Sequence, residues 1–337
     1  MTSTFIIAEA GANHNRNFNQ ALALIDVAVE AGASACKFQT YSSETLYSKN
    51  TPDFAGYKNI NQLIKDIELP REWQKDLKQY CDEKGIEFMS TPFDEKAVDE
   101  LVNLGVKRLK IAGFESTDFR FVEMVASTGL PLIISLGIGF DLNKHLDKIL
   151  EIQAKYDNDL TLLHCNNAYP TPMEDVNLKV IDHMLSKMWG PPENLSLFPL
   201  YNIGFSDHTE SPFTPSLAVA KGATTIEKHF TLSKHLPGPD HPFAMEPNQL
   251  KEMVNLIRQT ELALNNTYNG VFTPSEENFK KAMRSVVAKK PIKIGETFTL
   301  DNLTTKRPFL EGNIPASEFE WVLGKIADKD YNEDDFI

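Results

Sequence analysis

Short runs of apolar and β-branched residues alternate along the chain with longer amphipathic stretches. This pattern predicts strands at residues 5–10, 35–40, 87–91, 108–112, 132–136, 160–165, 202–207 and 224–230. Helical spacing of apolar positions, often closed by a glycine, appears between strands at residues 19–32, 71–85, 95–105 and 248–264. Eight β/α units within about 260 residues have the size and order of a TIM (β/α)8 barrel.

An open, doubly wound sheet is the competing α/β fold. Such a sheet usually carries a glycine-rich phosphate loop directly after its first strand. Residues 10–16, AGANHNR, do not have that pattern. We therefore predict a TIM barrel as the catalytic domain, over residues 1–265.

The pattern changes after residue 265. Residues 266–282 predict a linker with one helical piece, and residues 283–337 contain short strand-like runs with turn residues such as Gly295. A unit of about 55 residues has little core of its own. We expect a small β-rich domain that packs against a barrel, either its own or that of a partner.

Polar residues follow all eight predicted strands at their C-terminal ends. In a TIM barrel these ends form the mouth of the active site. One such residue is more often a hydrogen-bonded core residue than a functional one, but convergence from eight strands favours a functional site. The set consists of Glu9, Asn13, His14, Lys37, Gln39, Ser90, Thr91, Lys110, Ser135, His164, Asn166, Asn167, Ser206, Asp207, His208, Glu227 and His229.

Two histidines end neighbouring predicted strands. His208 and His229 are therefore expected to lie close together, and two imidazoles with carboxylates and water suit a divalent cation. We predict that they are metal ligands. His235 and His241 follow in the next loop, and spacing alone leaves them as alternative ligands.

Two lysines on other strands predict a site for a small anion. Lys37 and Lys110 offer point charges for a phosphate or carboxylate, and Thr91 and Ser135 offer hydroxyls to orient it. The chain has neither a P-loop nor a dinucleotide fingerprint. A small phosphorylated metabolite is therefore expected rather than a nucleotide.

Charge and composition exclude several other classes of partner. The formal net charge of −13 argues against nucleic acid and against an anionic membrane surface. No apolar run approaches the roughly 18–20 residues of a membrane span, and the start lacks a basic leader, so we expect a cytoplasmic protein. Cys36, Cys81 and Cys165 lack metal-ligand spacing and are expected to be buried thiols.

The chain resembles the sialic acid synthases, which comprise N-acetylneuraminate, legionaminate and pseudaminate synthases. The likeness covers nearly the whole chain and rests on motifs in conserved order: IIAEAGANHN, CKFQTY, STPFD, LLHCNNAYPTP, GFSDHT, IEKHFTL, GPDH, RSVVAKKPIKIGETFTLDNLTTKRP and VLGKIADKDY. The resemblance implies a TIM barrel followed by a small antifreeze-protein-like (SAF) domain. It also implies a domain-swapped homodimer.

The resemblance further implies a carbon–carbon bond-forming transferase. Such enzymes condense phosphoenolpyruvate with an N-acylated amino sugar, such as N-acetylmannosamine or 2,4-diacetamido-2,4,6-trideoxymannose, and release phosphate and a nine-carbon 2-keto acid. They use a divalent metal, commonly Mn²⁺ or Mg²⁺. The motif match gives His208 and His229 as metal ligands, Lys37, Thr91, Lys110, Ser135, Asn167 and Ser206 as phosphoenolpyruvate contacts, and Glu9, Gln39, Tyr169, Glu227 and Asp240 as sugar-binding or catalytic residues.

Catalysis is expected to rest on Glu9, Glu227, Lys37 and Lys110. One glutamate stabilises positive charge at the former enol carbon or activates the water that adds there, and the sequence leaves open which one is the base. The lysines assist the departing phosphate. Arg307, in TTKRP, resembles the arginine that the small domain sends into the neighbouring subunit's site to hold the N-acyl group.

Three residues depart from the family pattern. Gly113 stands where serine is usual, Arg16 where glycine is common, and Ala244 where serine is frequent. Loss of the hydroxyl at Gly113 affects the anion site, where a water or Ser116 is a candidate replacement. IEKHFTL, GPDH and NLTTKRP favour the neuraminate and legionaminate branches, with a diacetamido sugar preferred, whereas Phe114–Glu115 is typical of the pseudaminate branch.

Two other functions are compatible with parts of this pattern. One is a different metal-dependent barrel enzyme, such as a hydrolase or an aldolase-type synthase for another aldehyde; hydrolases of this kind usually carry an HxH pair, which this chain lacks. The other is a non-catalytic sugar-binding relative. It would be expected to have lost some of Lys37, Lys110, His208 and His229, and all four are present.

Overall fold

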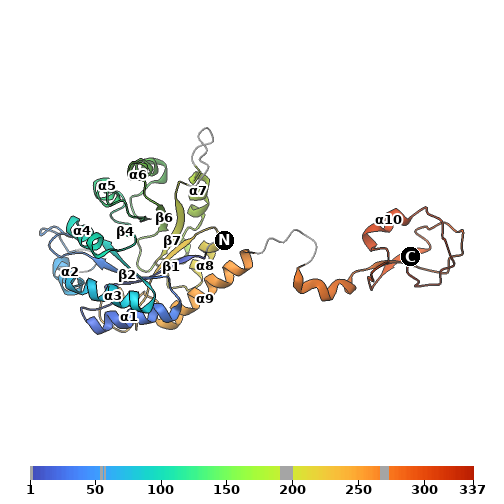
Figure 1. The fold of residues 1–337 in the computed structure, drawn as a ribbon, viewed down its shortest axis with the longest axis horizontal. Coiled ribbons are helices and arrows are strands. Elements are labelled where there is room, and N and C mark those ends of the chain that lie inside the picture. Colours follow the sequence, from blue (N-terminus) through green and yellow to red (C-terminus); the bar gives the residue numbers. More distant parts are fainter. Residues whose placement is uncertain (1–2, 54–55, 57, 190–199, 266–272) are drawn as a thin grey trace. The chain divides into compact units, whose positions relative to one another are not determined.

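The chain forms two compact units, residues 1–265 and 266–337. The computed structural model describes residues 3–53, 56, 58–189, 200–265 and 273–337 (Figure 1). Residues 266–272 of the expected linker lie outside the described residues. The rest of that linker contains the 3₁₀ helix η4, Pro274–Ala282, which opens with a capping box formed by Thr273 and Glu276.

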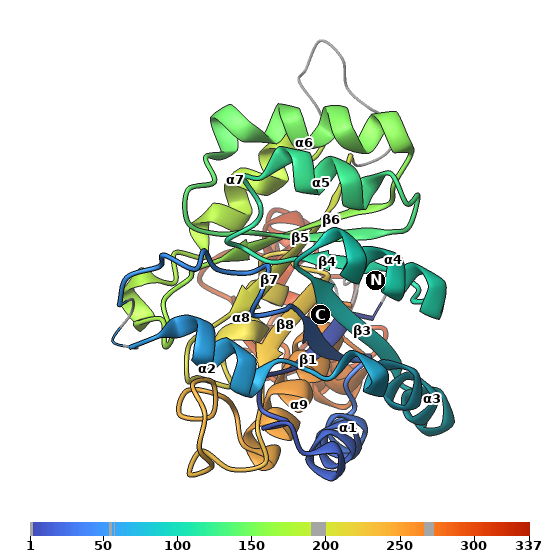
Figure 2. The ribbon, with the colours of Figure 1, turned by 90° about the vertical axis from the view of Figure 1, so that its left-hand side faces the viewer.

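Eight parallel strands form the centre of the first unit. They are β1 (Phe5–Gly11), β2 (Ala35–Thr40), β3 (Glu87–Pro92), β4 (Leu109–Ile111), β5 (Leu132–Leu136), β6 (Leu160–Cys165), β7 (Asn202–Asp207) and β8 (Thr225–His229). Their order is β3-β2-β1-β8-β7-β6-β5-β4, and the two end strands also contact each other. Figure 2 shows the helices arranged around these strands. The predicted TIM barrel is confirmed.

The helices of this unit alternate with the strands. They are α1 (Phe18–Ala31), α2 (Ile60–Ile67), α3 (Gln74–Lys84), α4 (Glu95–Leu104), α5 (Phe119–Ala126), α6 (Leu142–Tyr156), α7 (Lys179–Lys187), α8 (Thr214–Ala220) and α9 (Pro247–Leu264). Asn17 and Asp94 cap the first turns of α1 and α4. The helix expected at 71–85 begins as a 3₁₀ turn, Arg71–Trp73. No helix among the described residues combines the length and hydropathy that a bilayer span requires.

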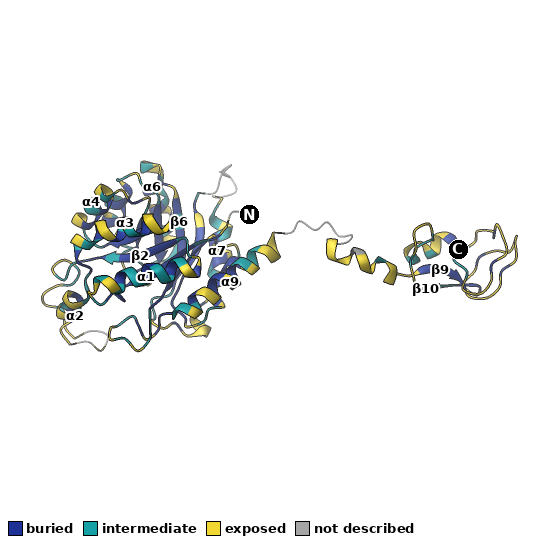
Figure 3. Ribbon diagram, turned by 60° about the horizontal axis from the view of Figure 1, so that its bottom comes forward, coloured by how far each residue is buried: buried dark blue, intermediate teal, exposed yellow. Residues whose placement is uncertain are grey.

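Alternation along the strands builds two apolar layers. Side chains that point outward pack between the strands and the helices, and Figure 3 shows buried strands beneath helices with exposed outer faces. Inside the barrel, a small apolar plug is formed by Ile7, Ala35, Met89, Ile133 and Leu163. Two residues further along these strands, the inward positions become polar. The plug therefore forms a floor beneath the polar residues at the C-terminal ends.

The second unit has its own small core. Strands β9 (Ser285–Ala288) and β10 (Leu303–Lys306) pair antiparallel, and α10 (Phe319–Val322) follows. Eight buried apolar residues pack together there: Val286, Ala288, Ile292, Phe298, Leu303, Val322, Ala327 and Tyr331. Gly295, named above as a turn residue, has a φ of 84°. The short strands expected in this region are therefore present as a two-stranded sheet with irregular connections.

Candidate active site

A narrow cavity lies at the C-terminal ends of the barrel strands. Its volume is about 40 Å³, and eleven of its lining residues are ones that the sequence singled out: Glu9, Lys37, Gln39, Thr91, Lys110, Ser135, Tyr169, Ser206, His208, Glu227 and His229. Gly113, Ala112 and Cys165 complete the lining. A space of this size holds about one or two water molecules. Binding of anything larger requires side chains of the lining to move.

Two lysines and two glutamates alternate in charge across the cavity. Lys37 Nζ lies 2.7 Å from Glu9 Oε2 and 3.6 Å from Glu227 Oε2, and Lys110 Nζ lies 3.4 Å from Glu227 Oε1. All four side chains are almost completely buried. Buried charges of this kind are tolerated only when they are paired, and here each charge has a partner of opposite sign.

The surroundings give the two glutamates different ionisation. Burial raises the pKa of Glu9 to about 7, since the lowering effect of Lys37 only partly offsets it and Glu227 raises it further. Burial also acts to raise the pKa of Glu227, but Lys110 and Lys37 outweigh it and hold this pKa well below its usual value. Glu227 is therefore ionised near neutral pH, whereas Glu9 titrates there.

Neutral polar groups complete the network around the charges. Lys37 Nζ donates to Thr91 Oγ1 at 2.9 Å, Gln39 Nε2 donates to Glu9 Oε1 at 2.8 Å, and Ser206 Oγ donates to Glu227 Oε1 at 3.2 Å. The buried hydroxyl of Ser135 has no hydrogen-bond partner among the described residues. Because an unpaired buried hydroxyl is costly, Ser135 is available to a ligand in this cavity.

The two predicted metal ligands face each other at the same cavity. The ring centroids of His208 and His229 are 5.4 Å apart. His208 Nδ1 lies 2.6 Å from the carbonyl oxygen of Asn166. Because the carbonyl can only accept, Nδ1 carries the proton and Nε2 keeps a free lone pair. Nδ1 of His229 is buried without a hydrogen bond, and Asp240 Oδ2 lies 3.9 Å away. Burial lowers the pKa of both imidazoles, so both are neutral, as metal ligands must be.

These donors fit a divalent cation as a partial ligand set. Within the described ranges, no group of three or more His, Cys, Asp or Glu side chains is arranged to hold a metal ion. The remaining ligands would come from water or substrate, as in metal sites that keep open positions for catalysis. His241 has a different role, because its ring nitrogens contact Thr231 Oγ1 at 2.6 Å and Asn15 Oδ1 at 3.1 Å. His235 is not among the residues that line the cavity.

Tyr169 and Asp240 lie beside the histidines. The ring of Tyr169 is 4.3 Å from that of His208 and 6.0 Å from that of His229. Asp240 Oδ2 accepts a hydrogen bond from Ala12 N at 3.4 Å, and burial raises the pKa of this carboxyl to about 6. Both side chains therefore flank the possible metal position.

Gly113 is in contact with Asn167. A Cβ atom on Gly113 would lie 2.9 Å from Asn167 Nδ2, and one on Gly137 would lie 2.0 Å from Asn167 Oδ1. The carboxamide of Asn167 thus occupies the space above both glycines, and its Oδ1 accepts a hydrogen bond from Ile138 N at 2.7 Å. Ser116 donates its hydroxyl to the carbonyl of Gly113 and is not among the lining residues, so it does not replace the usual serine.

Sequence reasoning placed some residues on the wrong face and missed others. His164 and Ser90 point away from the cavity, because His164 Nε2 contacts Val176 O at 2.7 Å and Ser90 contacts Thr40 at 2.7 Å. Cys165 lines the cavity but was not expected to, although its position two residues after inward-facing Leu163 indicated it. Its thiol is protonated, since burial raises its pKa to about 11. All three cysteines are free and buried, as expected.

Arg307 lies in the second unit and is exposed there. Its proposed role in a barrel site therefore stays a prediction.

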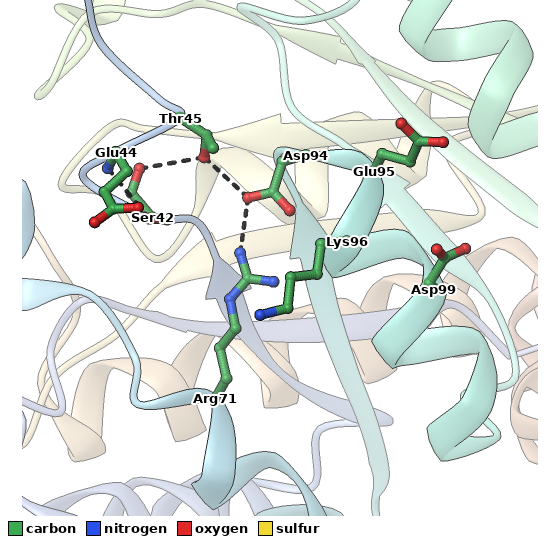
Figure 4. Close-up of a pocket in the computed structure, with 8 residues that line it drawn as sticks. All are labelled: Ser42, Glu44, Thr45, Arg71, Asp94, Glu95, Lys96 and Asp99. Atoms are coloured by element: carbon green, nitrogen blue, oxygen red, sulfur yellow. Dashed lines mark hydrogen bonds and ion pairs between the residues drawn. The ribbon is translucent and has the colours of Figure 1, made fainter. Parts of the chain in front are cut away.

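A second, larger pocket lies between the loop after β2 and the start of α4 (Figure 4). It has a volume of about 540 Å³. Its arginine, Arg71, is held by Asp94 at 2.7 Å and by Glu100 at 2.8 Å, and Thr45 donates to the same Asp94 at 3.0 Å. These contacts join the loop after β2 and the 3₁₀ turn at Arg71 to the start of α4.

Comparison with known proteins agrees with this geometry. Residues 24–269 match the NeuB family and residues 283–337 match the SAF domain. The chain is 38% identical to an N,N'-diacetyllegionaminic acid synthase from Campylobacter jejuni, across 100% of this chain and 99% of that protein. It is 35% identical to a pseudaminic acid synthase of the same species, across 97% of this chain and 93% of that protein.

A solved structure extends the likeness to three dimensions. The N-acetylneuraminic acid synthetase of Leptospira borgpetersenii, crystallised with citrate, superposes with a TM-score of 0.72 at 33% identity, covering 82% of this chain and 90% of that one. The family match spans most of the barrel, and the relatives match along the full length. The chain therefore belongs to the NeuB family, the sialic acid synthases that its motifs resemble.

Proposed function

We propose that this protein is a nonulosonic acid synthase that condenses phosphoenolpyruvate with an N-acylated amino sugar. The products are phosphate and a nine-carbon 2-keto sugar acid. The observation that carries this proposal is one cavity that combines two buried lysines and an unpartnered serine hydroxyl with two neutral imidazoles. Family membership and the names of the full-length relatives support it.

Lys37, Lys110 and Ser135 form the proposed anion site. In this structure both ammonium groups are paired with Glu227, at 3.6 and 3.4 Å. These distances are longer than the 2.7 Å between Lys37 and Glu9, so the Glu227 contacts are the ones that a phosphate would exchange. Thr91, Asn167 and Ser206 are the further contacts proposed for phosphoenolpyruvate.

His208 and His229 are the proposed ligands of a divalent cation, Mn²⁺ or Mg²⁺. When bound, this cation supplies Lewis acidity that polarises the aldehyde carbonyl of the open-chain sugar. The protein's own contribution is to hold both imidazoles neutral and to orient His208 through the carbonyl of Asn166.

We assign the proton transfer to Glu9 and charge stabilisation to Glu227. C3 of phosphoenolpyruvate forms a bond to the aldehyde carbon as the π bond of the aldehyde carbonyl breaks, and C2 becomes electron-poor beside ionised Glu227. The former carbonyl oxygen becomes a hydroxyl by taking the proton that Glu9 receives in the next step. Water then adds to C2 and gives a proton to Glu9, whose pKa of about 7 suits a base at neutral pH. The C2–O bond to phosphate breaks, assisted by Lys37 and Lys110, and the C2 hydroxyl proton leaves with the phosphate.

Gln39, Tyr169 and Asp240 are the proposed sugar contacts. Arg307 from a partner subunit would hold the N-acyl group, in a domain-swapped homodimer. We propose 2,4-diacetamido-2,4,6-trideoxymannose as the acceptor, in preference to N-acetylmannosamine, because the relative named for the diacetylated product matches over the full chain at 38% identity. We place this activity in the cytoplasm.

The test is phosphate release from phosphoenolpyruvate with Mn²⁺, using these two sugars and the altrose isomer of the diacetamido sugar. We expect phosphate release to be much faster with one of the sugars than with the others. A chelator should abolish this release, and the variant His208→Ala should show none. Release that survives chelation would contradict the metal assignment. No release with any of the three sugars would contradict the proposed acceptor class and favour a different aldehyde or a binding role without turnover.

A further inference from the structure

A buried ion pair lies directly behind the two histidines and has no place in the proposed chemistry. Lys228 Nζ lies 2.8 Å from Asp207 Oδ2, and the exposed fractions of the two side chains are 1% and 0%. Lys228 also donates to the carbonyl of Thr209 and contacts its hydroxyl at 3.3 Å. The ammonium group therefore has several oxygen partners and no access to solvent.

The pair faces away from the cavity because of strand alternation. Glu227 and His229 line the cavity, so Lys228 between them points to the outer face of β8. Ser206 and His208 also line it, which places Asp207 on the outer face of β7. Asp207 and Lys228 are directly paired in the β7–β8 ladder. Each charged residue thus immediately precedes one of the two histidines.

The same cluster fixes the backbone on both sides of His208. Asp207 Oδ1 accepts a hydrogen bond from Thr209 N at 2.8 Å, and Oδ2 accepts one from the Thr209 hydroxyl at 3.1 Å. The carbonyl of His208 accepts a hydrogen bond from Thr171 N at 2.9 Å. His208 is therefore held in a turn whose conformation depends on Asp207 and Lys228.

Stability alone does not account for such a pair. Removing two charges from water is costly, and apolar residues of similar size often stabilise a protein as well or better. What an apolar pair does not supply is the directional link between the turn at Thr209 and strand β8. Conformational precision next to His208 and His229 is the property that the ion pair provides and that packing would not.

We propose that the Asp207–Lys228 pair is a positioning element that sets the relative placement of His208 and His229 and thereby the affinity of the metal site. This inference rests on the proposed function, because it takes the two histidines as ligands. Neither Asp207 nor Lys228 contacts the cation or the substrates in this account. They act only through the backbone of the two histidines.

The experiment measures Mn²⁺ binding to the full chain without substrates, by calorimetry and by electron paramagnetic resonance of free Mn²⁺. The test variant is Asp207→Leu/Lys228→Met, which removes both charges and avoids leaving one of them buried alone. The control variant is Glu87→Gln/Arg108→Met. This ion pair, at 2.7 Å, joins the N-terminal ends of β3 and β4, at the end of the barrel away from the cavity. Urea unfolding of each variant separates stability from binding.

We expect the dissociation constant for Mn²⁺ to rise about 10- to 100-fold in the test variant, the range seen when groups that orient metal ligands are removed. The control variant should bind like the wild type. Lys228→Arg serves if the double variant does not fold, since a planar guanidinium cannot reproduce the contacts of the ammonium and should also weaken binding.

Unchanged Mn²⁺ affinity in a folded test variant would overturn the inference while leaving the proposed function intact. A wild-type chain that binds no Mn²⁺ would overturn both, because the histidine site itself would then be wrong. Equal weakening in the test and control variants would show a general effect of stability and would also overturn the inference.

Discussion

Glu9 and Glu227 contact the same ammonium group but differ in ionisation. Glu227 has Lys37 and Lys110 on either side, whereas Glu9 has Lys37 and the neutral amide of Gln39. The second lysine keeps Glu227 charged despite its burial, and the lack of one leaves Glu9 close to neutral pH. Identical side chains thus differ in ionisation because their neighbours differ.

The absence of a side chain at Gly113 leaves room for the carboxamide of Asn167. Gly113→Ser would place its Cβ against the carboxamide of Asn167 and strain the hydrogen bond from Ile138 N to Asn167. We expect weaker anion binding, seen as a rise of about fivefold in the KM for phosphoenolpyruvate, which corresponds to one lost hydrogen bond of about 1 kcal/mol. Steady-state kinetics at saturating sugar measure this.

A double-mutant cycle tests whether Gly113→Ser raises the KM for phosphoenolpyruvate by displacing Asn167. If Gly113→Ser acts by displacing Asn167, it should have little further effect in an Asn167→Ala background. Additive effects in the double variant would contradict this explanation. A lower KM in Gly113→Ser would show instead that a serine hydroxyl improves the site.

Glu115, in the loop after β4, gives a pH-dependent prediction. Its Oε2 is buried without a hydrogen bond among the described residues, and burial raises its pKa to about 7, partly offset by its own backbone and by Lys110. The unfolded chain releases this proton near pH 4.5, so wild-type stability falls relative to Glu115→Gln as the pH rises from about 4.5 to 7.

Urea unfolding at pH 5 and pH 7.5 compares the two proteins. The difference in unfolding free energy should shift in favour of Glu115→Gln by about 1–3 kcal/mol between these pH values. The comparison with wild type cancels the contributions of other titrating groups. A difference that does not change with pH would contradict the raised pKa.

At the scale of elements, strand alternation places the functional groups. The inward residue two positions after each residue of the apolar plug is Glu9, Lys37, Thr91, Ser135 or Cys165. A strand shifted by one residue would turn these groups toward the helices and bury them against apolar side chains. The register of the barrel strands therefore determines which residues line the cavity.

The start of α4 gives a prediction about element stability. Asp94 Oδ1 accepts a hydrogen bond from Ala97 N at 2.7 Å, and its other oxygen contacts Arg71 and Thr45 (Figure 4). Asp94→Ala should lower the unfolding free energy by about 1–2 kcal/mol, mainly through the lost cap. Asp99→Ala, exposed on the same helix, is the control and should have little effect. Equal losses in both variants would contradict a capping role.

At the scale of the whole molecule, the chain has two separate cores. The barrel core and the small core of the second unit do not share residues. The proposed function assigns Arg307 of the second unit to the sugar site. A domain-swapped homodimer would supply this arginine from the partner.

Subunit mixing tests this arrangement. His208→Ala and Arg307→Ala each impair the site in their own homodimer, the first through the metal and the second through a higher KM for the sugar. In a swapped heterodimer one site combines an intact barrel with an intact Arg307. Unfolding and refolding an equal mixture should therefore restore about a quarter of wild-type activity at low sugar concentration. No recovery would show that each chain uses its own Arg307.

The strands, the barrel and most residues of the cavity could be predicted from the amino-acid sequence. Parallel strands end at one face of a barrel, so polar residues at those ends are expected to lie close together. The alternation of side chains along a strand indicates which of them point inward. The family followed from motifs that keep their order along the whole chain. Local pattern is sufficient for the strands and for the side that each side chain faces, because these depend on neighbours within one strand or one turn.

The interactions between these groups could not be predicted from the sequence, because they depend on the folded arrangement of the strands. The ion pairs of Glu227 and the outward-facing pair Asp207–Lys228 join residues of different strands, and Asn167 and Gly113 come from the loops after β6 and β4. The unpaired hydroxyl of Ser135 likewise depends on what the other strands place beside it. Their energies depend on distances of a few ångströms and on the exclusion of water. Such distances are set when the barrel closes, and no segment of the sequence contains them.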